Sequence, residues 1–289
     1  MTKISSFIIN LIIKLFDGIL KFFARDNLIY SIGEKLEKNF YNEINVKDFT
    51  IKFYAPTLVI KWRFDTILSK EPETIEWIDG FDNSTEFIFW DIGANIGLYS
   101  LYTAKKYKNS KIISFEPSTS NLRVLSRNIS LNNLTNKIRI NQLPLFDKNL
   151  DFNLMKEKNF IEGGALNAFS VDHDYQGKKF FSENSYKIMG TSINYLINNN
   201  ILEIPDYIKI DVDGIEHLIL LGASKFLMDK KIKSICIELN EDFKDQLEFS
   251  LKILKDNNFT IRHKKHADEF DKSLKFSKIY NYIFDKKNS

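Results

Sequence analysis

Residues 87–92 form an almost unbroken apolar run, which is typical of a parallel strand that is buried on both faces. A helical pattern follows at residues 97–108, and the same alternation returns with a strand at 111–115 and a helix at 118–132. Further strands are predicted at 138–143, 207–212, 234–239, 259–263 and 279–284, and further helices at 215–227 and 243–256. Strands that alternate with helices form parallel sheets, so the sequence predicts an α/β fold with a doubly wound sheet.

The composition of the 289-residue chain fits a sizeable folded core, because 44% of its residues are hydrophobic. With 41 Lys and Arg against 38 Asp and Glu, the formal charge of +3 is too small to suggest a protein held to nucleic acid by bulk charge. Cys236 is the single cysteine, which excludes an internal disulfide and a Cys-based metal cluster. This cysteine usage predicts a reducing, cytoplasmic setting.

Polar residues recur about every 3.6 positions along the otherwise apolar N-terminal segment, which is the period of an α-helix. They are Lys3, Ser6, Asn10, Lys14, Asp17 and Lys21. Charges at this spacing argue against a transmembrane span, and the segment has no signal-peptide cleavage pattern. We expect an amphipathic helix that either packs on its own domain or on a second copy in a homo-oligomer, or lies on the inner face of a membrane. The membrane alternative rests on the three lysines and Arg25, which flank an aromatic, apolar face.

Two alternating runs, at residues 48–54 and 57–64, predict a β-hairpin around Ala55-Pro56. We therefore expect an extension over residues 1–64, made of the amphipathic helix and the hairpin. Residues 65–289 are predicted to form the main domain, since no Gly/Ser/Pro-rich linker divides them.

The first core strand runs into a turn with the sequence Asp91-Ile92-Gly93-Ala94-Asn95-Ile96-Gly97, at the sheet edge where doubly wound folds bind their ligands. Gly93 and Gly97 allow a tight turn close to a ligand. A dinucleotide fingerprint needs glycine where Asn95 and Leu98 stand, which argues against NAD and FAD. Glu116 ends the next strand, where an acid accepts hydrogen bonds from ribose hydroxyls. A ribose-binding acid without a phosphate-binding loop fits S-adenosylmethionine.

Three acids cluster after the strand at 207–212. Asp211 and Asp213 are alternate residues and are expected to share a face, while Glu216 opens the next helix. Clustered carboxylates have raised pKa values and can remove the proton of a hydroxyl group. Alternatively, the cluster holds a divalent cation that lowers the pKa of the hydroxyl directly, or Asp213 and Glu216 only cap the helix.

Three segments together resemble the FkbM family of S-adenosylmethionine-dependent methyltransferases, namely FWDIGANIGLYS at 89–100, FEP at 115–117 and IKIDVDGIE at 208–216. With shorter matches at 71–74 and 237–239, the resemblance covers about residues 66–259. It implies a class I, Rossmann-like methyltransferase fold whose sheet is mostly parallel with an antiparallel edge strand. It also implies methyl transfer, usually to a hydroxyl oxygen of a sugar or a natural product.

The resemblance also implies roles for single residues. The methionine end of the cofactor would be held by Asp91, Gly93, Asn95 and Gly97, its ribose by Glu116, and its adenine would lie beside Asp147. By analogy with metal-dependent catechol-type methyltransferases, the divalent cation would be bound by Asp211, Glu238 and Asn240.

We therefore expect an O-methyltransferase that acts on a hydroxyl of a sugar or glycan, a nucleotide-sugar or a secondary metabolite. The less regular residues 147–190 are where recognition of the acceptor is expected. A nucleic-acid methyltransferase is the alternative enzyme, which is disfavoured because the segment 211–214 lacks the Pro-Pro-aromatic turn of base-methylating enzymes. A non-catalytic scaffold that binds S-adenosylmethionine is the third alternative.

Overall fold

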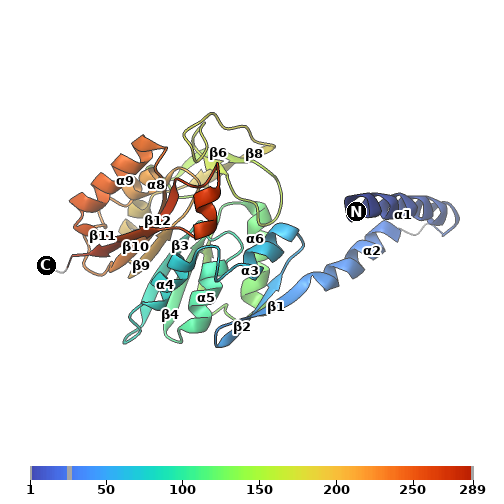
Figure 1. The fold of residues 1–289 in the computed structure, drawn as a ribbon, viewed down its shortest axis with the longest axis horizontal. Coiled ribbons are helices and arrows are strands. Elements are labelled where there is room, and N and C mark those ends of the chain that lie inside the picture. Colours follow the sequence, from blue (N-terminus) through green and yellow to red (C-terminus); the bar gives the residue numbers. More distant parts are fainter. Residues whose placement is uncertain (1, 25–27, 288–289) are drawn as a thin grey trace.

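A seven-stranded sheet forms the centre of the molecule, in a computed structural model that describes residues 2–24 and 28–287 (Figure 1). Its strand order is β11-β12-β10-β9-β3-β4-β5. The bounds are β3 (Phe87–Ile92), β4 (Ser110–Phe115), β5 (Ile138–Asn141), β9 (Tyr207–Ile210), β10 (Ser234–Asn240), β11 (Phe259–Lys265) and β12 (Ile279–Lys286). β3, β4, β5, β9 and β10 pair in parallel, which confirms the predicted doubly wound, mostly parallel sheet.

The antiparallel strand is β12, which pairs with β10 on one side and β11 on the other. It therefore lies one position in from the edge, and β11 is the edge strand. This corrects the predicted antiparallel edge strand. β11 and β12 follow one another in the chain and are neighbours in the sheet, so the connection of residues 266–278 brings the chain back antiparallel beside β11.

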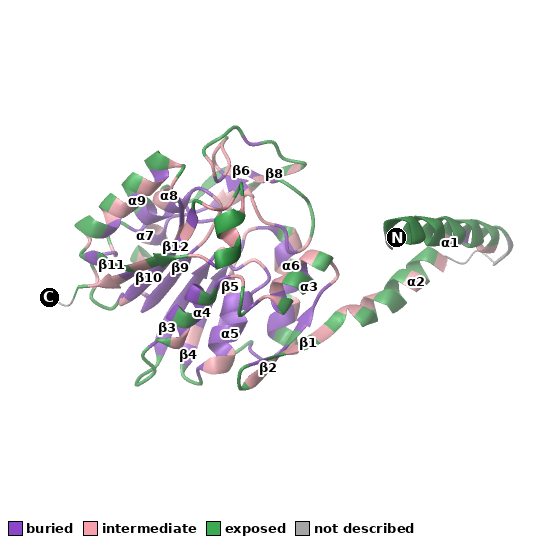
Figure 2. Cartoon of the chain, in the orientation of Figure 1, coloured by how far each residue is buried: buried purple, intermediate pink, exposed green. Residues whose placement is uncertain are grey.

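Two hydrophobic cores lie on opposite faces of the sheet, since alternate residues of β3 belong to different cores. The core that contains Phe87 and Phe89 packs against α4 (Pro72–Asp79), α5 (Leu98–Lys106) and α6 (Thr119–Leu131). The core that contains Ile88 and Trp90 packs against α7 (Ile193–Asn198), α8 (Glu216–Gly222) and α9 (Lys244–Asp256). Figure 2 shows the central strands buried between these helices, whereas the edge strand β11 is largely exposed.

The hairpin before the main sheet lies earlier in the chain than predicted. It consists of β1 (Tyr41–Val46) and β2 (Phe49–Tyr54), and the second predicted hairpin strand is instead the helix α3 (Leu58–Asp65). Thr57 caps this helix with its hydroxyl, which accepts a hydrogen bond from the Ile60 N–H. The prediction was wrong because apolar residues at 60 and 64 satisfy helical spacing as well as alternation.

A small three-stranded sheet lies between the fifth and ninth strands of the chain, within the region that the sequence marks as less regular. Its order is β7-β6-β8, with β6 (Asp151–Glu157), β7 (Ala168–Phe169) and β8 (Asn184–Gly190). The segment that joins β6 to β7 crosses the carboxyl ends of the main strands. This segment, residues 158–167, is called the covering loop below.

The helices α1 (Thr2–Ala24) and α2 (Leu28–Glu37) form an arm that projects from the body of the molecule (Figure 1). The two helices meet where the Ile29 N–H donates a hydrogen bond of 3.1 Å to Asp17 Oδ1. Short 3-10 helices follow α2 at Lys38–Phe40 and precede β12 at Asp268–Lys272. None of the described helices is both long and apolar enough to cross a membrane. Arg25, which the sequence places among the flanking cations, lies outside the described residues.

Candidate active site

A cavity of about 360 Å³ opens at the carboxyl ends of β3, β4, β9 and β10. The covering loop closes it on one side, with Gly164, Leu166 and Asn167 in its wall. This is the edge at which parallel sheets bind their ligands, at the point where the strand order reverses.

The turn after β3 approaches the end of β9 closely. Gly93 has a φ of +86°, and a Cβ atom on it would lie 1.8 Å from the Asp211 carbonyl oxygen. Only glycine fits this position, which therefore places the floor of the cavity beside Asp211. Gly97, which also has a positive φ, faces Leu125 of α6 and lies outside the cavity wall, so it contributes to the packing of α5 on α6.

Asp91 and Asn95 present hydrogen-bond acceptors that the protein leaves unused. Asp91 is buried and accepts a hydrogen bond of 2.6 Å from the Ser100 hydroxyl through Oδ2, while its Oδ1 has no partner among the described residues. Asn95 Oδ1 is likewise buried without a described partner, although its Nδ2 donates to the Gly164 carbonyl at 2.7 Å. Asn95 lines the cavity, whereas Asp91 is not part of its wall.

Glu116 lies at the end of β4 with its carboxylate in the cavity wall. Its Oε2 accepts the Asn95 N–H at 2.7 Å and its Oε1 accepts the Ser118 N–H at 2.8 Å. Burial raises the pKa of this carboxyl to about 7. Oε1 also accepts a long hydrogen bond of 3.5 Å from Asn121 Nδ2, and the second lone pair of Oε2 remains available for a hydroxyl of a diol such as a ribose.

Asp147 does not reach the cavity. Its side chain is exposed, and Leu143 and Leu145 from the same connection line the wall instead. Together with Phe115 and Phe169 they form an apolar surface suited to a flat aromatic ring. The predicted place of Asp147 beside the adenine is therefore not seen in the structure.

The two acids at the end of β9 both line the cavity, but their partners differ. Asp211 Oδ2 lies 2.7 Å from the ammonium group of Lys209, which is buried and lies 4.9 Å from the centre of the Tyr99 ring. Burial lowers the pKa of Lys209, and the carboxylates of Asp211 and Glu71 more than offset this, so that the pKa is raised. Lys209 is therefore a buried cation that holds Asp211 in place.

Asp213 binds the covering loop. Its Oδ2 accepts the N–H groups of Leu166 at 2.7 Å and Asn167 at 3.3 Å. Burial, together with the charge of Asp211, raises the pKa of Asp213 to about 6. The same loop is held from the other side by Asn95 and by Asn121, whose Nδ2 donates to the Gly164 carbonyl at 3.1 Å.

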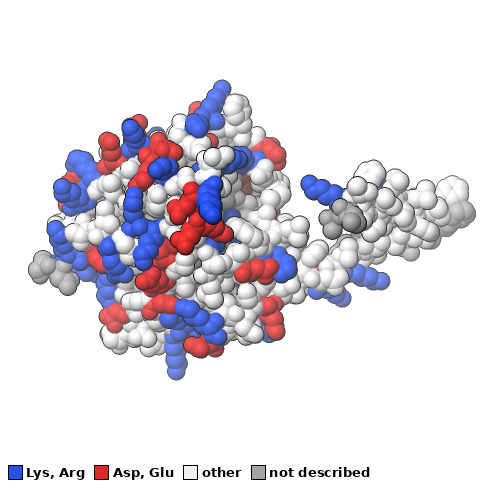
Figure 3. All heavy atoms as spheres, viewed as in Figure 1, with Lys and Arg blue, Asp and Glu red and all other residues white. Residues whose placement is uncertain are grey.

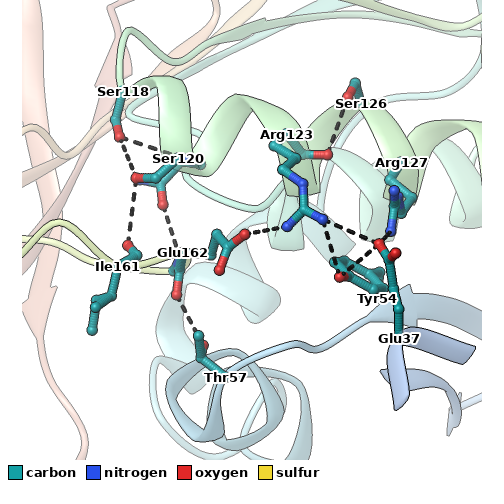
Figure 4. A network of polar contacts seen from close by, with 12 residues as sticks. Glu37, Tyr54, Thr57, Ser118, Ser120, Arg123, Ser126, Arg127, Ile161 and Glu162 are labelled. Carbon is teal, nitrogen blue, oxygen red and sulfur yellow. Dashed lines mark hydrogen bonds and ion pairs between the residues drawn. The ribbon is translucent and has the colours of Figure 1, made fainter. Parts of the chain in front are cut away.

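The outer end of the covering loop is attached to α6 and, through it, to α2. Figure 4 shows Arg123 between the carboxylates of Glu162 and Glu37, with Arg127 on the far side of Glu37. The Arg127 guanidinium lies 2.6 Å from Glu37 Oε1, and the Tyr54 hydroxyl donates to the same oxygen at 3.1 Å. The loop over the cavity and the base of the arm therefore share one group of ion pairs.

Glu216 does not face the cavity, although the sequence placed it in the acidic cluster. It accepts the Val212 N–H at 3.1 Å, the Gly214 N–H and the amide of Gln246. Burial raises the pKa of Glu216 to about 7. Glu216 thus stabilises the turn between β9 and α8, which corrects its predicted catalytic role, and the alternative that it caps the helix is not seen either, because α8 receives no side-chain cap from the described residues.

The predicted metal ligands do not converge. Asn240 Nδ2 donates to the Tyr175 carbonyl at 2.9 Å and its Oδ1 accepts the Asp242 N–H at 3.0 Å, so its side chain is turned away from the cavity. Within residues 2–24 and 28–287, no group of three or more His, Cys, Asp or Glu side chains is arranged to hold a metal ion. The metal site assigned to Asp211, Glu238 and Asn240 is therefore not supported.

Glu238, at the end of β10, lines the cavity next to Asp211. Its carboxylate receives no hydrogen bond from the part of the chain that the structure describes. Burial and the nearby charges of Asp211 and Glu71 raise the pKa of Glu238 well above its usual value. Among the predicted acids that line the cavity, the others each have a partner among the described residues. Glu238 is the one whose carboxylate forms no hydrogen bond or ion pair with them.

Five Lys, Arg and Glu residues in the cavity wall were not predicted from the sequence as site residues, namely Arg63, Lys70, Glu71, Glu73 and Lys209. Glu71 pairs with Lys70 and accepts a hydrogen bond of 2.6 Å from the Tyr99 hydroxyl. Burial alone would raise the pKa of Glu71, but Lys70 and Lys209 lower it. A signal was present for Lys209, because a lysine inside an apolar strand needs a buried partner.

A doubly wound sheet with this strand order, a glycine turn after its first strand and an acid after its second defines a class I methyltransferase fold. The chain belongs to the FkbM methyltransferase family, because the family model "Methyltransferase FkbM domain" matches residues 91–281. This confirms the family that the sequence motifs resemble.

Two curated relatives and one solved structure illustrate the similarity. Methyltransferase sdnD of Sordaria araneosa is 31% identical over 154 residues, which are 47% of this chain and 60% of that protein. Methyltransferase 1 of Beauveria bassiana (strain ARSEF 2860) is 25% identical over 161 residues, 50% of this chain and 63% of that protein. The crystal structure of methyltransferase FkbM from Methylobacillus flagellatus KT is 18% identical in sequence, with a TM-score of 0.45. The superposed region covers 72% of this chain and 45% of that chain. The chain thus spans less than two thirds of the length of these relatives.

Proposed function

We propose that this methyltransferase uses S-adenosylmethionine to methylate a hydroxyl group on a sugar or glycan, a nucleotide-sugar or a secondary metabolite. The observation that carries the proposal is the Glu238 carboxylate, which lines the cavity beside Asp211 with a raised pKa and no hydrogen bond from a described residue. A hydroxyl acceptor must lose a proton as its oxygen is methylated, and Glu238 is placed to take it.

The residues of the cavity fit S-adenosylmethionine. The unused acceptors Asn95 Oδ1 and Asn167 Oδ1 suit its ammonium group, Glu116 suits its ribose, and the apolar wall around Phe115 and Leu145 suits its adenine. When bound, the cofactor supplies a methyl group on a positively charged sulfur and leaves as S-adenosylhomocysteine. These residues support the predicted binding roles of Asn95 and Glu116, while Gly93 gives the cavity its floor.

The chemistry assigned to the protein is then a proton transfer. As the methyl–sulfur bond of the bound cofactor breaks and the acceptor oxygen takes the methyl group, the hydroxyl proton would pass to Glu238 and later to water. Asp211 is held by Lys209 at 2.7 Å, so its charge is fixed close to Glu238 and makes Glu238 the stronger base. Asp213 keeps the covering loop over the cavity, which excludes water from the reacting groups.

Replacement of Glu238 by glutamine tests this proposal. The rate of methyl transfer from labelled S-adenosylmethionine to a panel of hydroxyl acceptors should fall by about 10²–10⁴-fold, because the base is lost. Binding of S-adenosylhomocysteine, measured by calorimetry, should be unchanged. Glu241→Gln is the matched control, since Glu241 follows β10 and pairs with Lys264 outside the cavity.

The pH dependence supplies a second readout. Because the pKa of Glu238 is raised, wild-type turnover should rise with pH until this carboxyl is deprotonated, and the variant should lack that rise. Full turnover in Glu238→Gln would contradict the assignment of the base. Methylation of nucleic acid or amines alone would favour the nucleic-acid alternative, and cofactor binding without any transfer would favour the scaffold.

We further propose a cytoplasmic setting. The chain has a single cysteine, Cys236, which is buried in the core as a free thiol. A free thiol of this kind fits a reducing compartment. Figure 3 shows acidic and basic side chains interspersed over the visible face of the body, which favours a small acceptor over a nucleic-acid strand.

A further inference from the structure

The helix α1 turns its apolar face outward. Nine of its large apolar side chains are between 47% and 69% exposed, namely Ile4, Phe7, Ile8, Ile9, Leu11, Ile12, Leu15, Phe16 and Ile19. Figure 2 shows the helix exposed along its length, and Figure 3 shows it almost uncharged beside the mixed charges of the body. A contiguous apolar surface of this size marks a place where the protein contacts something else.

The arm leaves the apolar face of α1 uncovered, and of the polar stripe it buries only Asp17. Asp17, which belongs to that stripe, is buried against the start of α2 and accepts the Ile29 N–H at 3.1 Å. Lys21 pairs with the same carboxylate at 2.8 Å. An amphipathic helix that packs on its own domain buries its apolar face, so the uncovered face of α1 is directed at a partner outside the chain.

The width of the apolar face decides between partners. At about 100° per residue, the nine exposed positions cover an arc of roughly 200° around the helix. A neighbouring helix in a homodimer covers a narrower stripe, of roughly 100°. A continuous apolar medium covers the whole arc, and the acyl region of a bilayer surface is such a medium.

The charges of α1 favour a membrane of negative charge. The helix carries Lys3, Lys14 and Lys21 against the single acid Asp17, and Asp17 is already paired with Lys21. All three lysines are exposed and border the apolar arc, where they can contact lipid headgroups while the apolar side chains enter the bilayer. The lysines and the apolar arc both extend along the length of α1, so the helix would lie parallel to the membrane surface.

We propose that α1 is a membrane-docking helix that binds the surface of a bilayer containing anionic lipids through its exposed apolar arc. Docking orients α2 as the connection from the membrane to the catalytic body. This inference is independent of the acceptor and of the base assigned above, because α1 contributes no residue to the cavity wall.

Flotation of the full chain with vesicles tests the proposal. The chain should float with vesicles of phosphatidylcholine mixed with phosphatidylglycerol and bind vesicles of phosphatidylcholine alone more weakly. Ile8→Glu/Leu15→Glu places two charges at the centre of the arc and should reduce binding about 100-fold, since each apolar side chain contributes roughly a factor of ten when buried. The matched control is Phe181→Glu/Leu274→Glu, two still more exposed apolar sites off the arm, and this variant should bind as the wild type does.

Three results would overturn the inference. The full chain could stay in the buffer fraction in the presence of anionic vesicles, or the control variant could lose binding as fully as the α1 variant. The third is a stable dimer, seen by light scattering, that Ile8→Glu/Leu15→Glu dissociates while no vesicles are bound, which would assign the arc to a second copy. Binding of S-adenosylhomocysteine by every variant confirms that the catalytic body remains folded.

Discussion

Replacement of Lys209 by methionine should lower the free energy of unfolding by about 3 kcal/mol. The ammonium group is buried and lies 2.7 Å from Asp211 Oδ2, and the carboxylates of Glu71 and Asp91 also act on it. Methionine keeps most of the volume, so the cost comes from carboxylates that lose their cation. Breaking a buried ion pair from one side costs about 3–5 kcal/mol. The lower value applies because the Asp211 side chain is 24% exposed and stays partly hydrated.

Urea unfolding, followed by tryptophan fluorescence, measures this change. A loss of about 3 kcal/mol corresponds to a fall in melting temperature of roughly 6–12 °C for a domain of this size. Asp211→Asn and the double variant Lys209→Met/Asp211→Asn complete a thermodynamic cycle. The loss of unfolding free energy in the double variant should be smaller than the sum of the two single losses by at least about 1 kcal/mol. A Lys209→Met protein within about 1 kcal/mol of the wild type, or strictly additive losses, would refute the reasoning.

Three further outcomes are expected. Glu116→Gln should weaken S-adenosylhomocysteine binding by at least about 10-fold in calorimetry, because a charged acceptor is lost, whereas Asp147→Asn should leave it unchanged; equal effects would contradict the placement of the ribose. Burial raises the pKa of Glu216 from 4.5 to about 7, so between these pH values the folded protein holds a proton that the unfolded chain has lost, and its stability falls as the pH rises. Glu216→Gln should remove this contribution and lessen the fall of the urea midpoint between about pH 5 and 8, to which Glu116 and Asp213 also contribute, and an unchanged slope would count against it. Gly93→Ala should cost more than about 3 kcal/mol in thermal unfolding, since its Cβ would meet the Asp211 carbonyl at 1.8 Å, while Gly80→Ala, whose nearest contact is 3.5 Å, should cost less than about 1 kcal/mol.

The parts of the fold that are predictable from sequence are those in which neighbouring residues carry the information. The apolar run at 87–92 identifies a strand buried on both faces, and Gly93 and Asn95 identify a turn rather than a dinucleotide loop. Glu116 is predictable because its place depends only on the end of one strand and on the parallel pairing of β3 with β4. The position of the cavity follows from this local pattern.

The parts that sequence reasoning misses depend on contacts between distant residues. Glu216 resembles a catalytic acid until Gln246, thirty residues further on, is seen to bind it. The Glu71–Tyr99 hydrogen bond and the nearby Lys209 join three separate segments, which a helix or strand pattern cannot reveal. Local periodicity also misled the assignment of residues 57–64, where alternation and helical spacing coincide.

Arg123 divides its guanidinium between Glu162 of the covering loop and Glu37 at the end of α2 (Figure 4). A residue shared in this way makes the order of the loop and the orientation of the arm parts of one equilibrium. If a ligand in the cavity orders the loop through Arg123 and thereby favours binding by the arm, binding by the arm favours that ligand with the same coupling free energy. The effect is measurable from either end, as a change in cofactor affinity on docking of the arm or a change in docking on addition of cofactor.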